Sequence, residues 1–179
     1  MIGVEDRTTK GTPMGTTVHG LKPKHQVGEE FGRNVWGWKP LMDYISENHP
    51  KLGKLFEKNR LTELQAEKIA DALFADITSG LAERYTDGFE KHQANLEEVK
   101  CEICDGTGVR TDEVGMEKGM PQVSLDPALV QKYGRLLGWC NGCFGKGTHK
   151  TTESAYYLEL VDLEEFAEFL RNCGGAKIQ

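Results

Sequence analysis

The sequence lacks the signatures of several large functional classes. No stretch approaches the roughly 18 consecutive apolar residues of a membrane helix, so we expect no membrane partner. The first residues have neither the basic segment nor the apolar core of a secretion signal, which favours a cytoplasmic location. The motifs H-E-x-x-H, Walker A and G-x-S-x-G are absent, as is the signature of nucleobase deaminases. We therefore expect a protein that is not an enzyme.

Basic side chains are also fewer than acidic ones. The chain of 179 residues carries 22 basic and 28 acidic side chains, a net charge of −6. This balance argues against general affinity for a phosphate backbone. The adjacent acids Glu164 and Glu165 fall on the surface of an expected helix, where solvated carboxylates are more common than catalytic pairs. The length suffices for one hydrophobic core and a small additional module.

Cysteine is scarce, but four of the five cysteines follow a strict pattern. Two copies of C-x-x-C-x-G-x-G occur far apart in the chain. Their cysteines are Cys101, Cys104, Cys140 and Cys143, and their glycines are Gly106, Gly108, Gly145 and Gly147. Four thiols in two C-x-x-C pairs are the donor set of a closed tetrahedral Zn²⁺ site. The glycines suit turns that need positive φ and bring backbone amides close to the sulfurs.

Two other interpretations of the cysteine pairs exist, namely two disulfides or two redox-active dithiols. Disulfides are disfavoured in a reducing cytosol. Four thiolate ligands leave no open position for water or substrate, which favours a structural metal over a catalytic one. The fifth cysteine, Cys173, follows an apolar helical pattern and is expected to be a buried, inert thiol.

The organisation of the chain predicts an α+β fold with a mainly helical N-terminal half. Residues 1–33 are rich in Gly, Thr and Lys and are expected to form a flexible arm. Residues 34–99 form a helical region. It includes a helix opened by a capping box at Thr62 and Gln65, and Gly80 breaks or bends the helical pattern.

The second half of the chain contains the metal-binding pattern. Residues 100–150 are expected to form a zinc module with a helical insert that starts near Asp126. Residues 151–179 are expected to form a strand, from Ala155 to Val161, followed by a helix that Asp162 caps, and both pack on the core.

Four residues of the module are candidates for binding a partner: Phe144, Lys146, Asn141 and Tyr133. Phe144 is notable because it lies at the tip of the second cysteine turn, where an apolar side chain gains little from a core. An interface anchor at such a place contributes about 2 kcal/mol or more. The alternative is that Phe144 packs on the neighbouring cysteine turn, since a small module has little other core.

The two C-x-x-C-x-G-x-G repeats resemble the cysteine-rich zinc region of DnaJ-type chaperones. Such proteins usually carry four repeats and two zinc ions. Two repeats therefore imply one Zn²⁺, held by Cys101, Cys104, Cys140 and Cys143. J-domains carry His-Pro-Asp, whereas this chain has His49, Pro50 and Lys51 in another context. Stimulation of a chaperone ATPase is therefore not implied.

The wider pattern, from Asn34-Val-Trp-Gly-Trp to Cys-Gly-Gly-Ala-Lys-Ile, resembles uncharacterised bacterial and phage proteins with a DnaJ-like zinc finger. Some phage antitermination proteins also contain a zinc finger of this general type. We therefore expect a zinc-stabilised, non-catalytic binding or adaptor protein that recognises a protein partner. The alternatives are a nucleic-acid-associated regulator, as in phage-type transcription control, and a C-x-x-C thiol oxidoreductase.

Overall fold

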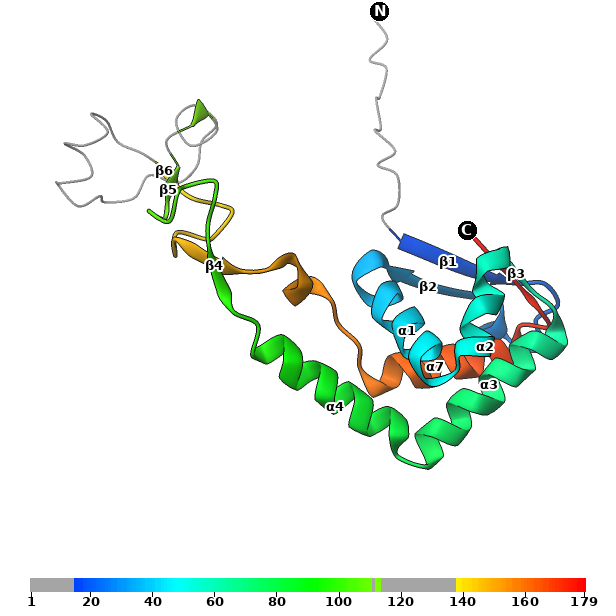
Figure 1. Cartoon of the computed structure of the whole chain (residues 1–179). Coiled ribbons are helices and arrows are strands. Elements are labelled where there is room, and N and C mark those ends of the chain that lie inside the picture. Colours follow the sequence, from blue (N-terminus) through cyan, green and yellow to red (C-terminus); the bar gives the residue numbers. More distant parts are fainter. Residues whose placement is uncertain (1–14, 111, 114–137) are drawn as a thin grey trace, which may run out of the picture. The chain divides into compact units, whose positions relative to one another are not determined.

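A computed structural model describes residues 15–110, 112–113 and 138–179, and these residues form two compact units. Unit 1 extends to His92 and resumes at Ala155, and unit 2 runs from Gln93 to Ser154. The chain leaves unit 1 through helix α4 (Leu81–Ala94), passes through unit 2 and returns to unit 1 (Figure 1). Helices and small antiparallel sheets together confirm the predicted α+β class.

Unit 1 contains a four-stranded antiparallel sheet in the order β2-β1-β8-β3. Its strands are β1 (Gly15–Gly20), β2 (Glu30–Asn34), β3 (Arg60–Leu61) and β8 (Ala176–Ile178). Val18 of β1 lies opposite Phe31 on one side and Ile178 on the other. Because side chains alternate along a strand, these three residues share the face that covers the core.

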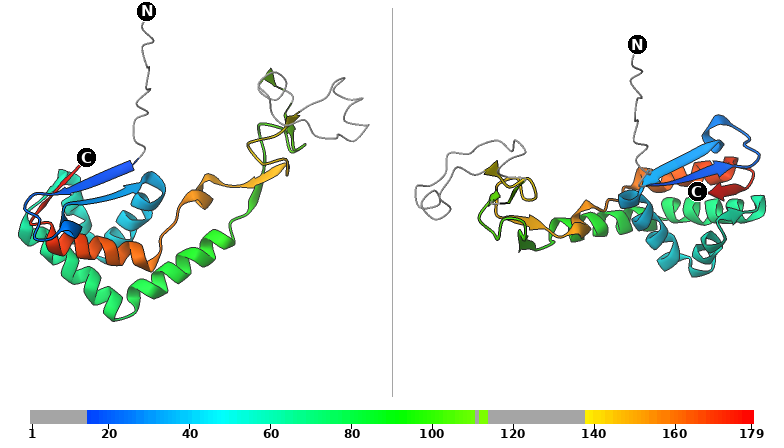
Figure 2. Two further views of the ribbon diagram at one scale, coloured as in Figure 1. Left: turned by 180° about the vertical axis from the view of Figure 1, so that it is seen from behind. Right: turned by 90° about the horizontal axis from the view of Figure 1, so that it is seen from above.

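Helices cover that face of the sheet (Figure 2). They are α1 (Val35–Asn48), α2 (Pro50–Gly53), α3 (Glu63–Thr78) and α7 (Leu160–Asn172), with short 3-10 turns η1 (Gln26–Gly28) and η2 (Lys54–Lys58). Tyr44, Phe166 and Phe169 are the largest of the fully buried side chains. No helix within the described ranges is long and apolar enough to cross a membrane.

Local signals in the sequence set the helix starts. The predicted capping box is confirmed, since the Gln65 amide donates to Thr62 Oγ1 at 3.3 Å and the Thr62 amide to Gln65 Oε1 at 2.9 Å. The helix pattern breaks at Gly80, which has a φ of 71° between α3 and α4. Asp162 is not the N-cap that we predicted for α7. The helix begins three residues after Tyr157, with Glu159 as its N-cap, and Asp162 accepts the Glu159 amide at 2.9 Å.

The prediction of a flexible arm is wrong for residues 15–33. β1 and β2 pair along their whole length, and both Val18 and Phe31 are buried. A strand with one face in solvent needs few apolar residues, so glycine and polar or charged residues fill the remaining positions. Residues 1–14, the rest of the predicted arm, lie outside the described residues.

The predicted strand from Ala155 to Val161 is also absent. A 3-10 turn, η3 (Thr152–Ala155), is followed by an irregular segment and then by α7. The two tyrosines of this segment pack against the start of α1. The Tyr156 ring contacts Trp36 edge-on at 5.3 Å between centroids, and the Tyr157 amide donates to the Trp36 carbonyl at 3.2 Å. The predicted insert helix near Asp126 lies outside the described residues.

An ion pair joins the sheet to α7. The Arg33 guanidinium of β2 donates to Asp162 Oδ1 at 2.9 Å and also pairs with Glu165. Its planar group lies 4.6 Å from the centre of the Phe31 ring. Only 21% of the Arg33 side chain and 10% of the Asp162 side chain are exposed. Removing either partner would therefore leave a poorly solvated charge.

We predict that Arg33→Met lowers the free energy of unfolding of unit 1 by about 2 kcal/mol, because Asp162 loses its buried partner. Arg171→Met is the matched control. Arg171 also lies over a phenylalanine ring, at 5.2 Å from Phe74, but its ion pair with Asp71 is exposed. Arg171→Met should lower the free energy of unfolding by less than about 0.5 kcal/mol beyond the effect of lost packing. Urea unfolding followed by circular dichroism would reveal the difference, and equal losses would contradict the role of the buried pair.

Candidate metal centre

The four cysteines of the repeated pattern meet in unit 2. Their sulfurs all lie within 4.8 Å of one another, and the four side chains are buried. Cys101 Sγ lies 3.8 Å from Cys140 Sγ, and Cys104 Sγ lies 3.7 Å from Cys143 Sγ. A zinc tetrahedron with Zn–S bonds near 2.3 Å has edges of about 3.8 Å, whereas a disulfide needs about 2.05 Å. All four are free thiols whose spacing suits a tetrahedral metal ion.

The two cysteine turns are related by a pseudo-two-fold axis. We call residues 101–108 the first knuckle and residues 140–147 the second, and equivalent positions differ by 39 in number. Strand β4 (Glu98–Lys100) precedes the first knuckle and pairs with β7 (Thr148–Lys150), which follows the second. Likewise β5 (Val109–Arg110) follows the first and pairs with β6 (Gly138–Trp139), which precedes the second.

Backbone hydrogen bonds repeat the same symmetry. The Cys101 amide donates to the Gly147 carbonyl at 2.9 Å, and the Cys140 amide donates to the Gly108 carbonyl at 2.8 Å. Each knuckle thus holds the end of the other. This exchange of hydrogen bonds brings the four cysteines together.

Backbone amides also point at the sulfurs. The Gly108 amide donates to Cys104 Sγ at 3.3 Å, and the Gly147 amide donates to Cys143 Sγ at 3.2 Å. Burial opposes ionisation of Cys104, but the Gly108 amide and the neighbouring sulfurs outweigh it and lower the pKa of this thiol to about 7. Burial raises the pKa of Cys140. A divalent cation would offset the repulsion that opposes ionisation of the whole set.

The four glycines of the pattern have the positive φ angles that the sequence predicts: 78° at Gly106, 76° at Gly108, 78° at Gly145 and 83° at Gly147. Two of them also allow close backbone approach. A Cβ on Gly108 would lie 2.3 Å from the Gly145 carbonyl oxygen, and one on Gly147 would lie 2.3 Å from that of Gly106. No side chain fits at either place.

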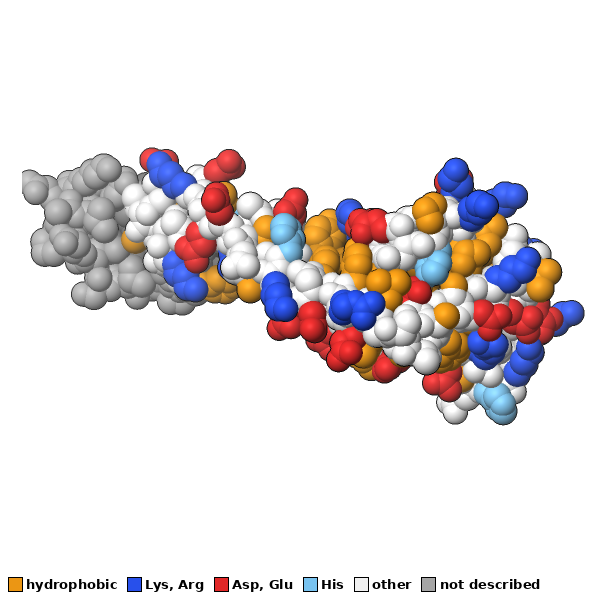
Figure 3. Space-filling view, turned by 60° about the horizontal axis from the view of Figure 1, so that its bottom comes forward, with side chains coloured by type: hydrophobic (Ala, Val, Ile, Leu, Met, Phe, Trp, Pro, Cys, Tyr) orange, Lys and Arg blue, Asp and Glu red, His pale blue; other side chains and the backbone are white. Residues whose placement is uncertain are grey.

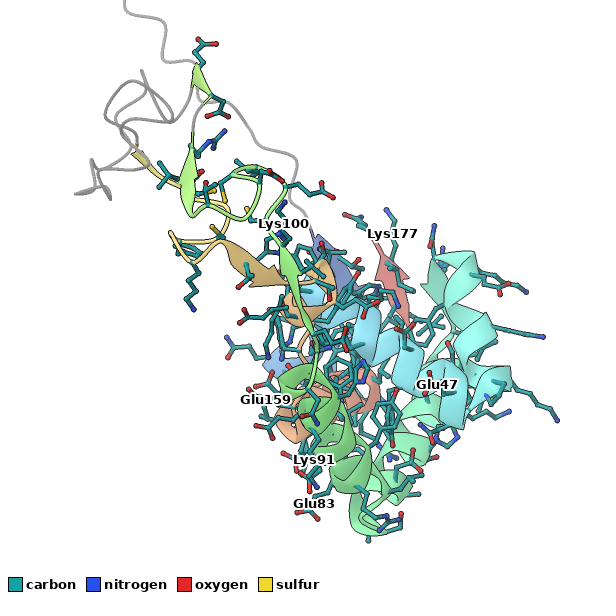
Figure 4. All side chains as sticks on the ribbon, turned by 60° about the vertical axis from the view of Figure 1, so that its left-hand side comes forward. Glu47, Glu83, Lys91, Lys100, Glu159 and Lys177 are labelled. Carbon is teal, nitrogen blue, oxygen red and sulfur yellow. The ribbon has the colours of Figure 1, made fainter. Side chains whose placement is uncertain are left out.

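Basic residues near the knuckles are engaged within unit 2. Lys100, labelled in Figure 4, pairs with Asp105 of the first knuckle. Arg110 pairs with Asp112 and donates to Asn141 Oδ1 at 2.6 Å. Lys150 Nζ donates to the carbonyls of Gln93 and Ala94 at 3.1 and 3.0 Å, which are the last residues of α4. A cation there also complements the helix dipole.

The predicted partner-binding residues have different surroundings. Phe144 is 75% exposed and has a φ of 52°, so it does not form part of a core between the knuckles. Lys146 is exposed, and Asn141 accepts the hydrogen bond from Arg110. Tyr133 lies outside the described residues.

The fifth cysteine belongs to unit 1 and is buried, as predicted. Cys173 is buried in the core of unit 1, where its thiol contacts the Leu170 carbonyl at 3.3 Å. Burial raises the pKa of this thiol, so it is held in the protonated, unreactive form.

Comparison with known proteins gives no name to this arrangement. No family model, curated protein or solved structure matches the chain. The donor set must therefore be judged on its own chemistry.

Reasoning from the sequence missed two contacts of the site. One is Lys150 on the end of α4, and the other is Ile103, whose side chain lies against Gly142. The offset of 39 residues between the repeats was the available signal, because aligning the knuckles shows that Ile103 and Gly142 occupy equivalent positions.

We predict that the purified protein contains about one zinc ion per chain, since one tetrahedral set is present. Cys104→Ser and Cys143→Ser should lose the metal, whereas Cys173→Ser should retain it. Elemental analysis by mass spectrometry measures this directly. Two metals per chain, or full retention in Cys143→Ser, would contradict the assignment of the four ligands.

A second prediction concerns the close approach of the knuckles. Gly108→Ala should weaken metal binding at least tenfold in a chelator competition, because strain at positive φ alone costs about 1–2 kcal/mol and the Cβ also meets a carbonyl. Gly88→Ala is the control, since a Cβ there would meet no atom within 4 Å. That change should leave metal affinity unchanged. Equal affinity in the two variants would show that the knuckles tolerate a side chain at the point of contact.

Proposed function

We propose that the chain is a zinc-stabilised, non-catalytic binding or adaptor protein that recognises a protein partner through unit 2. The observation that carries the proposal is the closed donor set of Cys101, Cys104, Cys140 and Cys143. Four sulfurs at tetrahedral spacing would fill the coordination of Zn²⁺ and leave no position for substrate. Bound zinc would supply folding free energy to unit 2.

The exposed aromatic at the second knuckle supports a role in recognition. Phe144 has a left-handed backbone with a φ of 52° and is 75% exposed. A bulky residue in this conformation costs about 1–2 kcal/mol. The equivalent position of the first knuckle holds Asp105, a residue type that tolerates this conformation better. A strained phenylalanine that is largely exposed suits the anchor of an interface.

Charge favours a protein partner over nucleic acid. Residues 93–154 carry seven basic and nine acidic side chains, and four thiolates around Zn²⁺ would add a charge of −2. On the face seen in Figure 3, basic and acidic side chains are interspersed and form no continuous basic patch. A module of this charge would be repelled by a phosphate backbone.

The thiol chemistry of the site argues against an oxidoreductase. All four sulfurs of the cluster are buried, whereas thiol–disulfide exchange needs an accessible thiolate. The symmetric pair of C-x-x-C-x-G-x-G knuckles is consistent with the proposed kinship to bacterial and phage proteins that carry a DnaJ-like zinc finger. A cytoplasmic setting, in which thiols remain reduced, fits such a site.

The proposal predicts that Phe144→Asn separates recognition from folding. Asparagine tolerates positive φ, so zinc content should be unchanged and stability equal or slightly higher. Affinity for a partner, captured from a bacterial lysate and then purified, should fall at least tenfold in calorimetry, as expected for loss of about 2 kcal/mol. Leu64→Asn is the matched control, since Leu64 is an exposed apolar residue of unit 1. Unchanged affinity in Phe144→Asn would rule out Phe144 as the anchor.

Binding to mixed-sequence duplex and single-stranded oligonucleotides tests the alternative regulator. We expect no sub-micromolar binding at low or moderate salt. Sub-micromolar binding that weakens steeply with salt, and is lost when Arg110, Lys146 and Lys150 are neutralised, would replace the adaptor by a nucleic-acid-associated regulator.

A further inference from the structure

The two knuckles share one backbone path but differ at the residue before the second cysteine. This residue is Ile103 in the first knuckle and Gly142 in the second. Ile103 is 49% exposed, so about half of its side chain is covered by the module.

The covered half of Ile103 lies where a side chain of Gly142 would otherwise project. A Cβ built on Gly142 would fall 2.6 Å from Ile103 Cδ1. The same point lies 3.6 Å from both Cys101 Sγ and Cys140 Sγ. Ile103 Cδ1 therefore lies beside this pair of sulfurs, in the place that a side chain of Gly142 would enter. A side chain on Gly142 would require the flexible end of Ile103 to move away.

The two sulfur pairs therefore have different neighbours. Cys104 and Cys143 receive hydrogen bonds from the amides of Gly108 and Gly147. On the side of Cys101 and Cys140, the terminal methyl group of Ile103 lies against the backbone of Gly142. Backbone amides of Gly142 and Cys143 also act on Cys140, so the distinguishing feature of the pair of Cys101 and Cys140 is the apolar side chain of Ile103 beside it.

We propose that Ile103 is a shield that slows release of the metal from the side of Cys101 and Cys140. This inference rests on the proposed zinc site, and Ile103 is a positioning residue that does not bind the metal. A metal held by four thiolates leaves by ligand exchange, in which water or a competing ligand must reach the metal. An apolar cover excludes such ligands and lowers the local dielectric, which strengthens the attraction between cation and thiolates.

The experiment is transfer of zinc from the full-length protein to an excess of chromophoric chelator, followed by stopped-flow absorbance. Ile103→Gly should release zinc at least tenfold faster than the wild type. Ile103→Val should stay close to the wild type, and Ile103→Ala should lie between the two. Leu64→Ala is the control, because it removes a more exposed apolar side chain that belongs to unit 1. This control should release zinc at the wild-type rate.

Exchanging the two residues gives the sharpest test. In the double variant Ile103→Gly with Gly142→Ile, the isoleucine extends from the equivalent position of the second knuckle toward the same two sulfurs, so slow release should be restored. The single variant Gly142→Ile should release zinc faster than the wild type, because two side chains compete for one place.

The outcomes separate this inference from the proposed function. Unchanged release in Ile103→Gly would overturn the shield, and so would fast release from a zinc-loaded double variant. Failure of the wild-type protein to bind zinc would overturn the proposed function itself. If the Ile103→Gly protein cannot be loaded with zinc, Ile103→Val and Ile103→Ala still test the proposal. Equal rates of zinc release in these two variants would also overturn the shield.

Discussion

Four sulfurs crowded into one buried site are the constraint on which unit 2 depends. The ladders around them are short, with β5 and β6 pairing over two residues and β4 and β7 over three. Isolated two-stranded ladders are marginal in water, so pairing alone cannot hold this unit together. A cation that offsets the repulsion of the thiolates would stabilise both ladders at once, because each joins one knuckle to the other. Glycine at positions 108 and 147 is a consequence of the same crowding, since the knuckles meet backbone to backbone there.

The pseudo-two-fold arrangement explains where the two knuckles agree and where they differ. The cysteines that form the cluster and the glycines of the turns are the same in both knuckles. Residues that project away from the cluster differ between them. Beside Cys101 and Cys140, Ile103 lies where a side chain on Gly142 would project, and at the tips, Asp105 of one knuckle contrasts with Phe144 of the other. The asymmetry thus places an apolar cover over one sulfur pair and an exposed aromatic at one tip.

The sequence predicted what depends on neighbouring residues. The cysteine pairs, the turn glycines and the capping box at Thr62 are each set by residues within a segment of eight or fewer, and repetition of the cysteine pattern predicted the cluster. Contacts between distant residues could not be predicted in this way. β1 and β2 show one buried apolar side chain each among polar neighbours, and their pairing brings Arg33 to Asp162, 129 positions away. Tyr156 and Tyr157 have strong strand propensity, but contacts with α1 replace the predicted strand. Likewise Ile103 gains its role only once Gly142 lies opposite.

The measurement that tests this account most directly is X-ray absorption at the zinc edge of the purified protein. The account predicts one shell of four sulfur scatterers at about 2.3 Å, the signature of a closed tetrathiolate site. A shell that includes nitrogen or oxygen at about 2.0–2.1 Å, or fewer than four sulfurs, would show an open or mixed site. Either result would contradict the structural metal at the centre of the account.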